Sequence, residues 1–187
     1  IFGARAARRE VGLFAALALA TLPRFFYHAH LNCFDVPVAL AVTFTVYAWW
    51  RSLQDRRWAL LAGLAFGLAL ATKHNSWLVP PVLLVHWIWL WCARRAARTR
   101  GEDAGRTPAP WGLLAMLTIG PLVLLSSWPW MWHDTLERIR EYVLFHTEHV
   151  HYNMAYLGTN YHRPPLPISY PFVMTLYTIP LTISCMI

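Results

Sequence analysis

The chain has 187 residues, of which 57% are hydrophobic and only 13% are charged. Soluble domains carry about 25% charged residues, so this composition excludes an ordinary soluble domain and indicates a membrane protein. The net charge of +7 does not indicate nucleic-acid binding, because the whole excess lies in three short basic loops between apolar segments.

Six apolar segments predict an all-α polytopic membrane protein with about six transmembrane helices. Short arginine-rich loops stay cytoplasmic, so a basic stretch at 5–9 predicts that 51–57 and 93–110 are also cytoplasmic and that the intervening loops face outward. The cytoplasmic loops hold eleven arginines and four acids, whereas the outer side holds five basic and five acidic residues. The segments span roughly 11–26, 36–50, 58–72, 76–92, 111–131 and 171–187, and the outer loops span 27–35, 73–75 and 132–170.

The first outer turn contains His28, His30 and Asp35. Asp35 directly precedes Val36-Pro37 at the start of a helix, so one interpretation is an N-cap acid with proline in the first turn. A carboxylate at the mouth of the membrane is equally suited to bind a metal or to orient a hydroxyl nucleophile. The two histidines, spaced two residues apart, make only a weak metal pair.

The segments 58–72 and 76–92 are short for two crossings of about 20 residues each, so the turn at 73–75 is expected to lie below the outer interface. Pro80 and Pro81 are expected to kink the helix that follows. Lys73, the only lysine of the chain, is either a lysine that extends to the interface or the cationic partner of an anionic phosphate. His86, deep in an apolar segment, is interpreted as a histidine satisfied within the core.

The stretch 93–110 is predicted to be a flexible cytoplasmic linker. Trp128, Trp130 and Trp132 are expected to form an aromatic belt at the outer interface. After them, the pattern from Asp134 to about Thr147 predicts an amphipathic helix lying on the membrane surface. The three cysteines show no metal-ligand spacing, and Cys92 and Cys185 fall in apolar runs.

The outer loop carries most of the remaining histidines. His149 and His151, with His146 before them, lie close together without a zinc-binding spacing, and their contact with water or lipid headgroups is an equally available interpretation. The proline-dense run from Gly158 to Pro171 is predicted to hold Tyr161, His162 and Arg163 in place without a helix. These side chains and the first outer turn are expected to share one side of the membrane.

Two stretches resemble membrane glycosyltransferases of the GT-C class, in the branch of protein O-mannosyltransferases and lipid A aminoarabinose transferases. One is Leu22-Pro23 followed by a histidine-containing turn and Asp35-Val36-Pro37, and the other is the run GLAFGLALATK at 63–73. The resemblance covers most of residues 1–180. It implies that 1–187 is part of one GT-C-type transmembrane domain, an internal fragment of a longer protein.

The resemblance also implies a function and a site. It implies a glycosyltransferase of the cytoplasmic (inner) membrane, active on its extracytoplasmic face, which takes a sugar from a polyprenyl-phosphate donor and passes it to a hydroxyl of a protein, lipid or glycan. Asp35 matches the acidic residue of the family's second outer loop. Lys73, His162 and Arg163 are expected to bind the donor phosphate, with His28, His30, His149, His151 and Tyr161 as supporting residues of the outer face.

The family's first outer loop, which holds its principal catalytic acid, has no counterpart in this sequence, so the general base is not assigned and the fragment alone is expected to be inactive. The cofactor is likewise not assigned, although a divalent cation is compatible with the acidic site. Two alternatives remain open: a histidine-rich membrane metal oxidase or desaturase, and a transporter with Asp35 and Lys73 along its path. No nucleic-acid partner is expected, and membrane lipids surround the chain.

Overall fold

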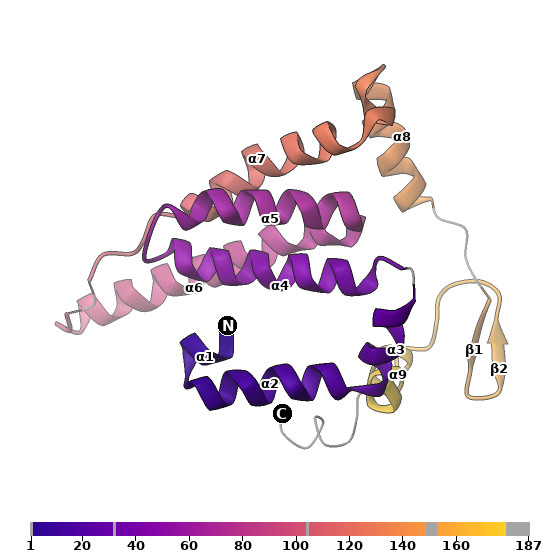
Figure 1. Ribbon diagram of the computed structural model, residues 1–187, viewed down its shortest axis with the longest axis horizontal. Helices are drawn as coiled ribbons and strands as arrows, with labels where there is room; N and C mark the ends of the chain where they lie inside the picture. Colours follow the sequence, from indigo (N-terminus) through magenta and orange to yellow (C-terminus); the bar gives the residue numbers. More distant parts are fainter. Residues whose placement is uncertain (1, 32, 104, 149–152, 179–187) are drawn as a thin grey trace. The chain divides into compact units, whose positions relative to one another are not determined.

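The computed structural model describes residues 2–31, 33–103, 105–148 and 153–178 (Figure 1). The chain forms two compact units, Ile1–His133 and Asp134–Ile187. Helices dominate both units, which confirms the mostly helical class that the composition predicts. The two units are described in turn.

The first unit begins with three helices, and the second and third of them divide the apolar segment expected at 11–26. Helix α1 spans Phe2–Ala6, α2 spans Arg9–Thr21 and α3 spans Pro23–His30. The apolar run expected at 11–26 is broken at Leu22, because proline lacks the N–H that would continue α2 and is suited to the first turn of a new helix. The first outer turn is therefore largely helical.

The core of this unit is built by three helices: α4 (Asp35–Ser52), α5 (Trp58–Thr72) and α7 (Trp111–Ser127). Helix α5 lies between the other two. Glycines allow the close approach: a Cβ at Gly63 would lie 2.7 Å from the carbonyl oxygen of Ala115, and one at Gly67 would collide with Val123. The fully buried Trp49 and Met116 fill the space between these helices. Small residues at such contacts are typical of helix packing in membranes.

A short 3₁₀ turn, η1 (His74–Leu78), leads into α6 (Val79–Thr99). Pro80 and Pro81 lie in the first turn of α6, so the expected kink is wrong: they start this helix. Helix α6 also continues to Thr99, so the stretch expected as a flexible linker from 93 is helical in its first third; alanine and arginine are good helix formers. The Trp49 indole donates a hydrogen bond to Nδ1 of His86 at 3.2 Å, which confirms that this histidine is satisfied within the core.

Within the described residues, one helical stretch, His74–Thr99, is long and apolar enough to cross a membrane. The apolar helices α5 and α7 are shorter. Six spans are therefore not established by helix length alone. The first unit ends in η2 (Pro129–Trp132), where the buried Met131 and a hydrogen bond from the Trp132 indole to the carbonyl of Leu125 fold the chain back on α7.

The second unit contains α8 (Thr135–Thr147), a hairpin of β1 (Met154–Tyr156) and β2 (Thr159–Tyr161), and α9 (Tyr170–Thr178). Helix α8 matches the amphipathic helix predicted at 134–147. The hairpin departs from the all-α expectation. Its two-residue turn, Leu157-Gly158, has positive φ at both positions (47° and 82°), the conformation that closes antiparallel strands tightly.

Candidate functional site

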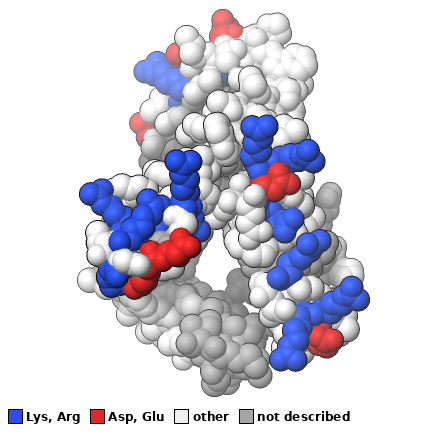
Figure 2. All heavy atoms as spheres, turned by 90° about the vertical axis from the view of Figure 1, so that its left-hand side faces the viewer, with Lys and Arg blue, Asp and Glu red and all other residues white. Residues whose placement is uncertain are grey.

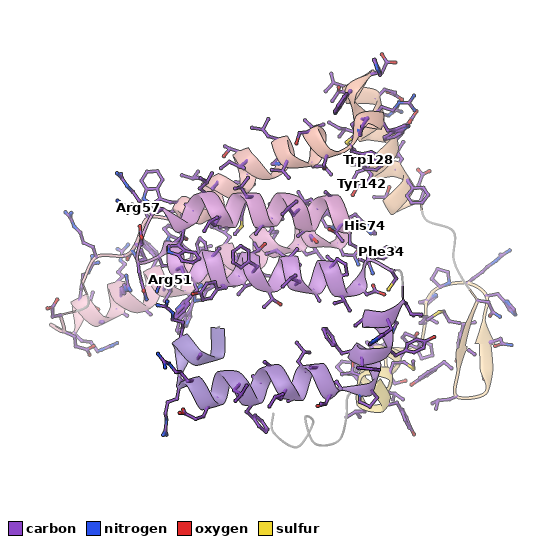
Figure 3. The ribbon with its side chains drawn as sticks, viewed as in Figure 1. Phe34, Arg51, Arg57, His74, Trp128 and Tyr142 are labelled. Atoms are coloured by element: carbon purple, nitrogen blue, oxygen red, sulfur yellow. The ribbon has the colours of Figure 1, made fainter. Side chains whose placement is uncertain are left out.

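The site begins with the α4–α5 hairpin. The two helices pack against each other and are joined by the short polar stretch 53–57. Because the chain reverses there, the first residue of α4 and the residue after α5 lie at the same end of the hairpin. Figure 3 shows this arrangement: Phe34 and His74 lie at one end, and Arg51 and Arg57 lie at the other. The geometry brings Asp35 and Lys73 together although they are far apart in sequence.

The two side chains form an ion pair. Nζ of Lys73 donates a hydrogen bond to Oδ1 of Asp35 at 2.9 Å. The lysine side chain is 31% exposed and the aspartate 44%, so the pair is half-buried and still open to solvent. One interpretation of Asp35, that of an N-cap acid, is wrong: the N-cap is Phe34, and no side chain caps α4. The carboxylate is engaged by the lysine instead.

The backbone around Lys73 explains why its side chain leaves the helix. Lys73 has an extended conformation (φ −154°, ψ 128°), which ends α5. The buried hydroxyl of Ser76 then donates to the carbonyl of Ala69 at 3.0 Å, and this oxygen also accepts the backbone N–H of Lys73 at 2.9 Å. The expected break at 73–75 is therefore present, and it is continued by the 3₁₀ turn.

The charge state of Asp35 follows from its neighbours. The hydrogen bond from Lys73 is the main cause that holds the pKa of this carboxyl below its usual range, and a hydrogen bond from Cys33 acts in the same direction. Partial desolvation opposes both. The carboxyl precedes the apolar part of α4 and is ionised at neutral pH.

Three further groups surround the pair. The ring of Phe34 lies beneath the ammonium of Lys73, with 4.7 Å from Nζ to the ring centroid. Sγ of Cys33 is 3.5 Å from Oδ2 of Asp35, and Nδ1 of His28 is 3.8 Å from the same oxygen. The sequence pattern predicts His28 near Asp35 but does not single out Cys33 and Phe34, whose position directly before Asp35 is the available signal.

The remaining predicted residues are not part of this cluster. His30 is exposed, and its Nδ1 lies 2.7 Å from the carbonyl oxygen of Phe26, with the two rings in contact. Tyr161 ends β2 in the second unit, and the exposed His162 and Arg163 follow it. His149 and His151 lie outside the described residues. Of the predicted set, the first unit thus brings together Asp35, Lys73 and His28.

The loop that carries His162 and Arg163 is held by its own contacts in the second unit. The buried Tyr156 shares a hydrogen bond with Ser169, 2.9 Å between the two hydroxyl oxygens, and its ring lies against Tyr170. The peptide bond between Pro164 and Pro165 is cis. The contacts of Tyr156 join the end of the loop to strand β1.

Comparison with known proteins identifies a family for the first unit. The family described as dolichyl-phosphate-mannose-protein mannosyltransferase matches residues 3–128, a range that includes both Asp35 and Lys73 and ends before the second unit. No curated protein matches the chain. No solved structure matches it either.

Proposed function

Because the chain belongs to the dolichyl-phosphate-mannose-protein mannosyltransferase family, we propose that it transfers a sugar from a polyprenyl-phosphate donor to a hydroxyl acceptor on the extracytoplasmic face of a membrane. The family consists of integral membrane glycosyltransferases of the GT-C type, so glycosyl transfer is the class of activity. Family membership favours this class over the metal oxidase and the transporter. Donor, acceptor and sidedness belong to the proposal.

The observation that carries the proposal is the ion pair of Lys73 and Asp35. The ammonium of Lys73 is partly exposed and lies at the end of an apolar helix, where the phosphate of a lipid-linked donor would lie. Breaking the bond between the anomeric carbon and the phosphate oxygen leaves negative charge on the lipid phosphate. A fixed cation at that oxygen stabilises the charge as it develops.

Asp35 has the complementary task. While Lys73 holds Oδ1, the carboxylate is a weak base, because the lysine keeps its pKa low. Donation of the ammonium to a donor phosphate frees Oδ1 to accept a hydrogen bond from the acceptor hydroxyl. The same event raises the basicity of the carboxylate at the moment when the hydroxyl must be oriented for attack.

The arrangement of charges supports an extracytoplasmic site. Arginines gather at the end of the first unit opposite Lys73, in the α4–α5 turn and at the end of α6 (Figure 2). Arginine-rich loops mark the cytoplasmic side of membrane proteins. With this orientation, the end that carries Asp35 and Lys73 faces away from the cytoplasm.

We also propose that His162 and Arg163 of the second unit bind the donor phosphate, as the family resemblance implies. His162 and Arg163 are exposed on a loop that Tyr156 and Ser169 hold, with Tyr161 at the end of the preceding strand. An arginine suits bidentate recognition of a phosphate, and a histidine adds a further donor. Their role as phosphate ligands remains a prediction, as do the supporting roles of His149 and His151.

The test is transfer of radiolabelled sugar from polyprenyl-phosphate mannose to a hydroxyl acceptor by the full-length protein in membranes. Asp35→Asn and Lys73→Ala should each lower the rate by about 10²–10³-fold, the loss typical of removing one group that stabilises charge in a transition state. Asp55→Asn is the matched control, since Asp55 lies in the opposite turn and its carboxylate accepts a hydrogen bond from the backbone N–H of Arg57. It should retain the wild-type rate.

A charge swap separates catalysis from structure. In the double variant Asp35→Lys with Lys73→Asp the ion pair is preserved in reverse, so a purely structural pair would regain function. The proposal expects no recovery, because the phosphate would then meet a carboxylate at position 73. Wild-type turnover in either single variant, or recovery in the swap, would contradict the proposed roles.

A further inference from the structure

Three different ligand atoms converge beside the ion pair. Nδ1 of His28, Sγ of Cys33 and a carboxylate oxygen of Asp35 all lie within 4.8 Å of one another, and all three residues are half-buried. They use the oxygen that Lys73 leaves free: the lysine contacts Oδ1, whereas Cys33 and His28 approach Oδ2. The cluster is therefore distinct from the lysine contact, although both share Asp35.

The spacing suits a small tetrahedral cation. Zinc binds nitrogen and oxygen at about 2.0–2.2 Å and thiolate at about 2.3 Å, so the edges of such a tetrahedron are about 3.3–3.6 Å long. The distance from Sγ of Cys33 to Oδ2 of Asp35 is 3.5 Å, and that from Nδ1 of His28 to the same oxygen is 3.8 Å. Two of the three edges are thus close to the length that a bound ion requires.

The histidine nitrogen is also otherwise unused. Nδ1 of His28 is buried and has no hydrogen-bond partner. A buried polar atom without a partner is costly and calls for an explanation such as an unoccupied ion site. This nitrogen lies 3.8 Å from Oδ2 of Asp35, the same oxygen that the thiol of Cys33 approaches.

Local backbone structure creates this convergence. His28 lies in the last turn of α3, and Asp35 is the first residue of α4. Between them, the N–H of Cys33 donates a hydrogen bond to the carbonyl of Leu31 at 2.8 Å. The thiol of Cys33 points back to the carbonyl of His28 at 3.8 Å. All three ligands thus come from one short segment.

We propose that His28, Cys33 and Asp35 form a binding site for a divalent cation of the zinc class. One nitrogen, one sulfur and one oxygen donor suit zinc better than magnesium or calcium, which prefer oxygen ligands. Three protein ligands leave a fourth position open, the arrangement of a catalytic zinc site. Deprotonation of the Cys33 thiol on binding offsets part of the added positive charge beside Lys73. The site goes beyond sugar transfer and does not depend on it.

The test uses the full chain purified in detergent, stripped with a chelator and titrated with Co²⁺ and then with Zn²⁺. Cobalt bound to a thiolate gives a charge-transfer band in the near ultraviolet, and zinc should abolish it at one equivalent per chain. His28→Ala and Cys33→Ser each remove a ligand. Substitutions of residues that only support a metal ligand weaken binding by about 10–100-fold, so these two variants should weaken it by more than that.

Matched controls separate this site from other histidines and cysteines. His30→Ala removes a ring that contacts Phe26 instead, and Cys92→Ser removes the exposed cysteine of α6. Both should bind as wild type. Cys33→His should restore binding without the thiolate band, which shows that loss in Cys33→Ser does not reflect misfolding.

Absence of the thiolate band in the wild type, or its persistence in Cys33→Ser, would overturn the proposal. Because the spectrum requires no sugar donor, this result is independent of the glycosyltransferase assay. Sugar transfer without metal binding would reject the metal site alone, and metal binding in a protein without transfer would reject only the proposed function.

Discussion

The packing of α5 on α7 leads to a prediction that can be worked out from distances. A Cβ at Gly63 would lie 2.7 Å from the carbonyl oxygen of Ala115, 2.9 Å from the carbonyl carbon and 3.0 Å from Cβ of Ile119. Optimal contacts between non-bonded heavy atoms are about 3.5–4.0 Å, so the helices would have to separate by about 0.8 Å. The first two obstacles are backbone atoms, which cannot rotate away.

We therefore expect Gly63→Val to destabilise the protein. Overpacking of a close contact costs about 1–3 kcal/mol, and three added carbons place this variant near the upper end of that range. Valine has a higher helix propensity than glycine, which offsets a few tenths of a kcal/mol of this loss in stability. The net loss of about 2–3 kcal/mol corresponds to a fall of about 4–12 °C in the midpoint of thermal unfolding for a chain of this size.

The assay is thermal unfolding of the full chain in detergent, with Ala71→Val as the matched control. Ala71 lies on the exposed side of the same helix, so the same new side chain should change the midpoint little. Since α5 ends at Lys73, Gly63→Val should also lower sugar transfer more than the control does. An unchanged midpoint in Gly63→Val would refute the reasoning, because it would mean that α5 and α7 do not meet at this glycine.

Three further predictions follow from single contacts. His86→Leu leaves the indole N–H of the buried Trp49 without its acceptor, so unfolding experiments should show a loss of about 1–3 kcal/mol; an unchanged stability would contradict the contact. Tyr156→Phe removes the hydrogen bond to the serine in the same loop and should raise the KM for the donor more than it lowers kcat; a change in kcat alone would count against loop anchoring. The hydrogen bond from Lys73 lowers the pKa of the Asp35 carboxyl in the folded protein. The contribution of the ion pair to stability is therefore fully present at a pH above the pKa of this carboxyl in the unfolded chain, and it is lost as the pH falls through the lower pKa of the folded state. Infrared titration should show this pKa rising in Lys73→Met, and no rise would argue against the pair.

The sequence predicted the part of the site that depends on helix order. Two apolar segments joined by a short basic turn must form a hairpin, and the ends of a hairpin lie together. That reasoning placed Asp35 and Lys73 on the same side, and the structure brings them to 2.9 Å. Helix order alone does not predict that the Asp35 carboxylate bonds Lys73 and leaves the N-terminus of α4 uncapped, because this depends on side-chain directions across two helices.

Other features were beyond sequence patterns because they depend on the local backbone path. Cys33 has no ligand spacing in the sequence, yet its thiol lies 3.8 Å from the carbonyl oxygen of His28. The hairpin at 154–161 is too short to show alternation, and its turn is recognised mainly from positive φ at Leu157 and Gly158. The end of α6 was missed because arginine-rich sequence was interpreted as a linker, although arginine favours helix.

The two oxygens of Asp35 make the proposals separable. Lys73→Ala removes the partner of Oδ1 and leaves the Cys33 thiol and the His28 ring at Oδ2. It should therefore lower sugar transfer by about 10²–10³-fold while Co²⁺ binding persists. Cys33→Ser has the opposite pattern, since the ion pair remains while the metal ligand is lost. A variant of Asp35 alone should impair both processes, because it is the one residue that the two sets of contacts share. If Lys73→Ala and Cys33→Ser instead gave identical losses in both assays, the carboxylate would act as one structural unit, and the division of labour between its oxygens would be wrong.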